Sequence, residues 1–160
     1  IAVFDIQPMR DSFYQTLGQS NGFNTPDTAN PFLSDIAQIT LKNGFQVLFK
    51  QKRDIGSLVN KKYFKRVEKL TQTENFLSVE SNIDAFQLIE QSDAVISMGF
   101  TSTALIAKEL GKPSIYYDPN GQLQKDDRAA HGILVIRGKE ELEDWVSSLD
   151  LLESLEYSRF

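Results

Sequence analysis

A buried apolar segment gives way to a helical pattern at three consecutive hydroxyl residues, Thr101, Ser102 and Thr103. The turn before them contains Gly99 and Phe100. The first amides of a helix lack hydrogen-bond partners and carry the positive end of the helix dipole. Amides and hydroxyls together are typical of a phosphate site, and Gly99 lets a ligand approach the backbone. The alternative interpretation is that Thr101 only caps the helix.

A second group of candidate residues ends the apolar run at 45–50. This run leads into the cations Lys50, Lys52 and Arg53. A lysine offers a point charge and an arginine a planar fork of donors, so both suit phosphate oxygens. Solvated charge at a strand end is the alternative interpretation. The further lysines between 61 and 69 fall on one helix face, and we interpret them as a solvated surface.

Polar residues after two other apolar runs are candidates for contacts to the remainder of a ligand. Glu80 and Asn82 follow the run at 76–79 and are candidates for a base or ribose. Asp118 ends the run at 114–118, and His131 lies in the loop beyond it. Both are candidates for contacts to a sugar, although a structural or surface role for His131 is the alternative.

The composition excludes several classes of protein. The 160 residues are 41% hydrophobic and 24% charged, as expected for one globular domain. There is no cysteine and only one histidine, so disulfides, thiolate metal sites and histidine-rich metal centres are excluded. We expect no metal and a cytoplasmic location, at the inner face of the membrane through the full-length protein. The net charge of −5 argues against general nucleic-acid binding.

The charge is unevenly distributed along the chain. Residues 50–69 hold eight basic residues against two acidic ones, a local balance of +6. The remainder carries nine basic and 20 acidic residues, a balance of −11. A positive segment in an acidic domain suits a small anion without making the chain a general polyanion binder.

Short apolar runs alternate with amphipathic stretches along the whole chain. Strands are predicted at 1–6, 45–50, 76–79, 94–98, 114–118 and 133–136. Helices are predicted from the Asn30–Pro31 cap to Gly44, around 63–70, over 101–110 and over 139–155. The segment 11–30 is predicted to be irregular. The alternation predicts an α/β fold with a doubly wound, mainly parallel six-stranded sheet of Rossmann-like type. Ligands of such sheets bind beyond the carboxyl ends of the strands, where the candidate residues fall.

The run from Ile83 to Tyr117 resembles the donor-side, C-terminal domain of GT-B glycosyltransferases. More narrowly, it is similar to bacterial polysaccharide-biosynthesis proteins with a Pro-Phe-Thr-Ser (PFTS) motif. That motif corresponds to residues 99–102, with Gly99 in place of the proline. The opening FDIQP and the segment KDDRAAHGI extend the resemblance over most of the chain.

The resemblance implies that residues 1–160 are one nucleotide-sugar-binding domain of a longer two-domain enzyme. Its partners would be the nucleotide-sugar, a missing N-terminal acceptor domain and a glycan or lipid-linked acceptor, with no nucleic acid. Bacterial sialyltransferases hold a CMP-sugar with a lysine-containing strand end and a Ser-Ser/Thr turn. A CMP-sugar is therefore preferred to a UDP- or GDP-sugar, although Gln51–Lys52 stands where His-Pro would be expected.

The expected function is donor binding for glycosyl transfer in capsule, O-antigen or lipopolysaccharide biosynthesis, with no cofactor. This fragment alone is expected to transfer nothing, because the resemblance places the general base in the missing domain. Two alternatives remain open: a non-catalytic nucleotide- or phosphate-binding module, and a sugar-nucleotide epimerase of related fold. A response-regulator receiver ranks below them, because no phosphorylatable aspartate follows the third predicted strand.

Overall fold

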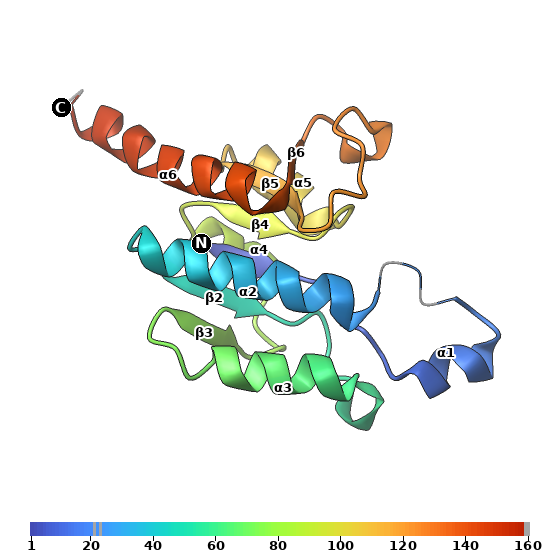
Figure 1. Ribbon diagram of the computed structural model, residues 1–160. Helices are drawn as coiled ribbons and strands as arrows, with labels where there is room; N and C mark the ends of the chain where they lie inside the picture. The colour runs from blue at the N-terminus through green and yellow to red at the C-terminus, as the bar shows by residue number, and fades with distance from the viewer. Residues whose placement is uncertain (21, 23, 159–160) are drawn as a thin grey trace.

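Six parallel strands form one sheet in the order β3-β2-β1-β4-β5-β6 (Figure 1). The computed structural model describes residues 1–20, 22 and 24–158. The strands are β1 (Ala2–Phe4), β2 (Val47–Lys50), β3 (Phe76–Val79), β4 (Val95–Ser97), β5 (Ser114–Asp118) and β6 (Leu134–Arg137). This confirms the predicted doubly wound α/β fold. The order also differs from the 2-1-3-4-5 order of receiver domains, which excludes that alternative.

Helices cover both faces of the sheet. They are α1 (Asp11–Leu17), α2 (Pro26–Lys42), α3 (Lys61–Leu70), α4 (Ala85–Glu90), α5 (Ser102–Glu109) and α6 (Gly138–Tyr157), with short 3₁₀ turns at Gly56–Leu58 and Arg128–Ala130. Side chains of α2, α3 and α6 share one apolar cluster, and those of α4 and α5 pack into others. Figure 1 shows α2 between α3 and α6 on one face of the sheet.

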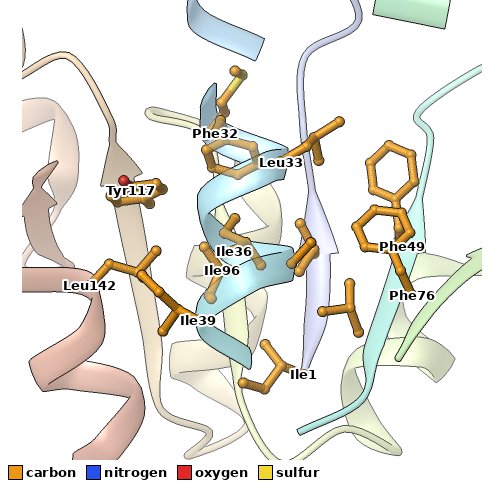
Figure 2. Close-up of a cluster of buried hydrophobic side chains, with 14 of the residues drawn as sticks. Ile1, Phe32, Leu33, Ile36, Ile39, Phe49, Phe76, Ile96, Tyr117 and Leu142 are labelled. Carbon is orange, nitrogen blue, oxygen red and sulfur yellow. The ribbon is translucent and has the colours of Figure 1, made fainter. Parts of the chain in front are cut away.

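The larger core lies between α2 and the strands. Ile36 and Ile39 of α2 point onto the sheet, with Phe49 and Phe76 on one side and Tyr117 on the other (Figure 2). Each of these side chains is almost fully buried. Burial of such a side chain stabilises a fold by roughly 1.5–3 kcal/mol, so α2 is firmly fixed over the centre of the sheet.

Two expectations about residues 11–30 were wrong. This segment is not wholly irregular, because it contains α1 and the first turn of α2, which begins at Pro26 rather than at Asn30–Pro31. Pro26 suits the first helical turn, where the missing N–H has no partner to lose. Pro31 then lies inside the helix and cannot donate to the carbonyl of Asp27. The Asn120 amide donates to that carbonyl instead, at 3.3 Å, which offsets part of the loss.

Among the residues that the structure describes, no helix is long and apolar enough to cross a membrane.

Candidate functional site

The carboxyl ends of β1 and β4 meet at the centre of the sheet, where the strand order reverses. The chain leaves β1 toward α2 on one face and leaves β4 toward α5 on the other. The Ile6 amide lies 3.2 Å from the Met98 sulfur, which joins the two departing loops. A topological switch point of this kind is where doubly wound sheets bind ligands.

The turn of residues 99–102 lies at this switch point. The Gly99–Phe100 peptide bond is cis, and the Phe100 ring packs edge-on against Tyr116 at a centroid distance of 5.3 Å. The Tyr116 hydroxyl donates to the Thr101 carbonyl at 2.8 Å. The contacts with Tyr116 of β5 therefore fix the position of the turn and the direction in which the chain enters α5.

Two of the three hydroxyl groups, those of Thr101 and Thr103, form hydrogen bonds within the protein. Thr101 Oγ1 donates to the Met98 carbonyl at 2.9 Å, and Thr103 Oγ1 lies 2.8 Å from Ser97 Oγ. Thr101 stands at the N-cap position of α5, yet its side chain caps no amide. Within the described residues no hydrogen bond joins the exposed Ser102 hydroxyl to the protein. Ser102 and the uncapped first-turn amides are thus the groups that can reach a ligand.

Gly99 packs under a side chain from across the turn. A Cβ added at Gly99 would lie 2.8 Å from Cδ1 of Leu123, so the end of this half-buried side chain would have to move aside. Leu123 belongs to the loop after β5, and its amide donates to Asp118 Oδ2 at 2.6 Å. The loop therefore lies over the turn, and Leu123 is the residue that a side chain at position 99 would displace.

The cations at the end of β2 have separate environments. Lys50 is buried, and its ammonium donates to the Ser81 carbonyl at 2.9 Å. Lys52 and Arg53 are exposed, and the Arg53 amide donates to the Gln7 side chain at 3.2 Å. Lys50 thus helps to hold the loop after β3, whereas Lys52 and Arg53 have side chains open to solvent.

The register separates this end of β2 from the motif turn. Lys50 and Ser97 are both paired with Phe4 of the intervening strand. Neighbouring strands lie roughly 4.8 Å apart, so the two backbones are about 10 Å apart. A single phosphate could not contact both places, although a nucleoside diphosphate could extend between them.

A hollow of about 390 Å³ lies beyond the ends of β2 and β3. Two residues singled out in the sequence, Arg53 and Glu80, line it together with Gln7, Gln51 and Ser81. Asn82 is exposed in the same loop but is not among the lining residues. This hollow offers both donors and acceptors, as a base or ribose requires.

The remaining two candidates lie apart from this group. Both carboxylate oxygens of buried Asp118 accept backbone amides, from Asn120 at 3.1 Å and from Leu123. Asp118 therefore shapes the loop over the motif turn. His131 lies just before β6, toward the opposite edge of the sheet, and its carbonyl accepts the Lys108 ammonium at 2.9 Å. The structure does not bring His131 to the switch point.

A buried aspartate at the switch point was not among the predicted site residues. Asp5 follows β1, and the Tyr63 hydroxyl of α3 donates to its Oδ2 at 2.5 Å, while Oδ1 has no partner in the described residues. Burial raises the pKa of the Asp5 carboxyl to about 7, and the Tyr63 hydrogen bond opposes part of that rise. The only sequence signal is a carboxylate directly after an apolar strand, which does not reveal its burial.

The family model for the polysaccharide biosynthesis PFTS motif proteins matches residues 1–146. The chain belongs to this family. No protein with curated annotation is significantly similar to it. Membership of the PFTS motif family indicates a role in polysaccharide biosynthesis and confirms the narrower resemblance seen in the sequence. The residues assigned to the motif from the sequence, Phe100, Thr101 and Ser102, form the turn at the switch point, with Gly99 in the expected proline position.

In the part of the chain that the structure describes, no three His, Asp or Glu side chains gather as a metal-binding group would. The positive charges nearest the switch point are protein groups, namely the α5 amides and the β2 cations.

Proposed function

We propose that this PFTS family member binds a nucleotide-sugar and acts as the donor-binding domain of a two-domain GT-B glycosyltransferase. The bacterial surface polysaccharides are the expected products. Family membership supports a biosynthetic role, and the order of the parallel strands is the one that suits nucleotides. The observation that carries the proposal is the motif turn, where an exposed Ser102 and uncapped amides meet at the switch point.

In the proposed complex, Ser102 and the first amides of α5 bind the phosphate attached to the sugar. Arg53 and Lys52 bind the more distant phosphate or ribose, and Glu80 contacts the base or ribose in the neighbouring hollow. Lys50 acts indirectly, because its ammonium holds the Ser81 loop in place. The separation of about 10 Å between the motif turn and the end of β2 suits a donor with two phosphates, so here a UDP- or GDP-sugar is preferred over the CMP-sugar favoured by the sequence.

The reaction is a displacement at the anomeric carbon. An acceptor hydroxyl forms a new bond to this carbon, the bond to the donor phosphate oxygen breaks, and the hydroxyl proton passes to a general base. Negative charge develops on the leaving phosphate, so donors already aimed at it lower the barrier. We assign the general base to a second domain, and this chain alone is expected to bind donor without transferring its sugar.

Calorimetric titration with CMP, UDP, GDP and inorganic phosphate tests this proposal. Selective binding of one nucleotide is expected, and Ser102→Ala combined with Arg53→Ala should weaken it by about tenfold to a hundredfold, since each lost hydrogen bond to a charged group costs about 1.5 kcal/mol. The matched control is Ser147→Ala combined with Arg128→Ala, which removes the same groups from exposed positions outside the assigned site. This control should bind like the original chain.

Equal binding of all four compounds would instead indicate a non-catalytic phosphate module. No binding by the folded chain, or equal losses in the two double variants, would contradict the assigned site. Sugar transfer by the chain alone would contradict the assignment of the base to another domain.

A further inference from the structure

The outer surface of α3 carries a row of lysines. Tyr63, Val67 and Leu70 are buried against the sheet. Lys61, Lys65 and Lys69 recur at every fourth residue on the opposite, exposed side. At 1.5 Å per residue this row is about 12 Å long. Together with Lys62 and Arg66 these lysines form what we call the basic face of α3.

The basic face forms no ion pair within the described residues, although Asp11 and Asp27 line a hollow together with Lys61 and Lys62. The ion pairs found among the described residues are Lys42–Glu143 and Lys125–Glu141, and neither involves α3. The nearby Asp54 accepts the Gly56 amide at 3.0 Å. Glu68 is the only acidic residue in α3, so the helix keeps a net charge of +4.

The positions of these lysines are unfavourable for the helix. Lys61 and Lys62 occupy the first turn, which holds no acidic residue, although the helix dipole favours negative charge there. Like charges four residues apart, as in the row, also destabilise a helix. A negatively charged partner along the outer side would remove both penalties.

The rest of the molecule fixes how such a partner can approach. Helix α6 carries seven acidic residues and one basic residue, a balance of −6. It lies beyond α2, on the side away from α3 (Figure 1). An extended anionic surface therefore attracts the α3 side and repels the α6 side, which orients the chain.

We propose that the basic face of α3 docks the protein on a bilayer of anionic phospholipids. The row of lysines is exposed along its whole length, so an extended surface can contact several of them at once. Phe64 of the same helix is 49% exposed and lines the hollow beyond β2 and β3, so an aromatic ring is accessible beside the basic face. Basic helical faces with an aromatic residue bind at the level of lipid headgroups. The accessible aromatic ring favours a bilayer over a second copy, in which a two-fold axis would pair α3 of each molecule with the acidic α6 of the other.

Co-sedimentation with lipid vesicles tests this inference on the 160-residue chain. Vesicles of phosphatidylcholine alone are compared with vesicles that also contain phosphatidylglycerol, at low and high salt. The test variant combines Lys61→Gln, Lys62→Gln and Lys65→Gln, and the control combines Lys42→Gln, Lys125→Gln and Lys139→Gln, which are also exposed. Far-ultraviolet circular dichroism and thermal melting establish that both variants are folded.

Binding to the anionic vesicles only, weakened by salt, is expected. The test variant should lose about a hundredfold in partition, since each lysine near an anionic surface contributes about a fivefold factor. The control should lose less than about threefold. Equal losses in the two variants, or no selective binding to anionic vesicles, would overturn the proposal. So would two other results: tighter binding to single-stranded RNA than to vesicles, or salt-sensitive self-association abolished by the test variant.

Discussion

At the scale of single residues, the motif turn depends on contacts with residues far along the chain. Gly99 lies under Leu123, Thr103 pairs with Ser97, and Tyr116 holds the Thr101 carbonyl. A hydroxyl that is bonded inside the protein is a poor ligand for a phosphate, because that internal bond would have to break first. Ser102 is thus the side chain of the turn on which ligand binding should depend most.

Exchange of Gly99 for alanine tests the packing of this turn. Gly99→Ala should lower the free energy of unfolding by only about 1 kcal/mol, because the end of the flexible Leu123 side chain can move away from the new methyl group. Leu123→Ala opens the same space, so the double variant should be less destabilised than the sum of the two single changes by about 0.5 kcal/mol. Urea denaturation of the four proteins measures this coupling. Strictly additive effects would show that Leu123 does not restrict residue 99.

The buried Asp5 predicts a dependence of stability on pH. Its pKa rises from 3.8 to about 7 on folding, so between these values the folded chain holds a proton that the unfolded chain has lost. The free energy of unfolding should therefore fall as pH rises from 4 to 7, by up to about 1.4 kcal/mol per pH unit from this group. Below pH 4 both states are protonated and the contribution is complete.

Denaturant titrations at several pH values compare the original chain with Asp5→Asn. The asparagine removes the titration and can still accept from Tyr63, so the decline between pH 4 and 7 should become shallower. The control Asp126→Asn changes an exposed carboxylate and should leave the decline unchanged. Parallel profiles for the original chain and Asp5→Asn would refute the assignment.

At the scale of elements, helix ends determine where charge is favourable. The amides of α5 are uncapped at the switch point, whereas Asn60 caps α3 by accepting the Lys62 amide at 2.9 Å. The first turn of α3 nevertheless carries two lysines. The first turns of the two helices therefore present different groups. Helix α5 presents backbone N–H donors to a ligand, whereas α3 presents charged side chains to solvent.

Reversal of charge at the two ends of α3 measures this effect. Lys62→Glu should raise the free energy of unfolding by about 0.5 kcal/mol, because a carboxylate suits the first turn. Lys69→Glu makes the same change of charge in the last turn, where the dipole opposes it, so the gain from removing the repulsion with Lys65 should be cancelled and the net effect should be close to zero. Thermal unfolding at low salt compares them, and high salt should reduce the difference. Equal gains at both ends would show that the dipole does not govern this helix.

At the scale of the whole molecule, strand order and charge work together. The sheet brings the ends of β1, β2, β3 and β4 to one edge, where the motif turn and the hollow beyond β2 and β3 lie. The basic face of α3 begins at the same edge, because α3 follows β2, whereas acidic α6 covers the far side near β5 and β6. On an anionic surface the chain would thus keep its candidate donor site close to that surface.

Much of this organisation could be predicted from local patterns. Continuous apolar runs separated by amphipathic stretches specify buried parallel strands, so the sheet and most helices follow from the sequence. The continuation of α2 through Pro31 was missed, because the carbonyl of Asp27 that Pro31 leaves unpaired accepts a hydrogen bond from the Asn120 side chain of a distant loop. The cations, the hydroxyls and Glu80 were chosen as candidates because strand ends mark the ligand edge of such sheets.

The sequence by itself determined the fold class, the family motif and the positive segment between 50 and 69, since each is set by residue types at close spacing. The tertiary structure alone decided which hydroxyl is free, that Lys50 is tied to Ser81 and that Asp5 is buried against Tyr63. These properties depend on partners brought together from remote positions, 58 residues apart for Asp5 and Tyr63. Burial and hydrogen bonding of a polar group are set by those partners, and local sequence carries no record of them.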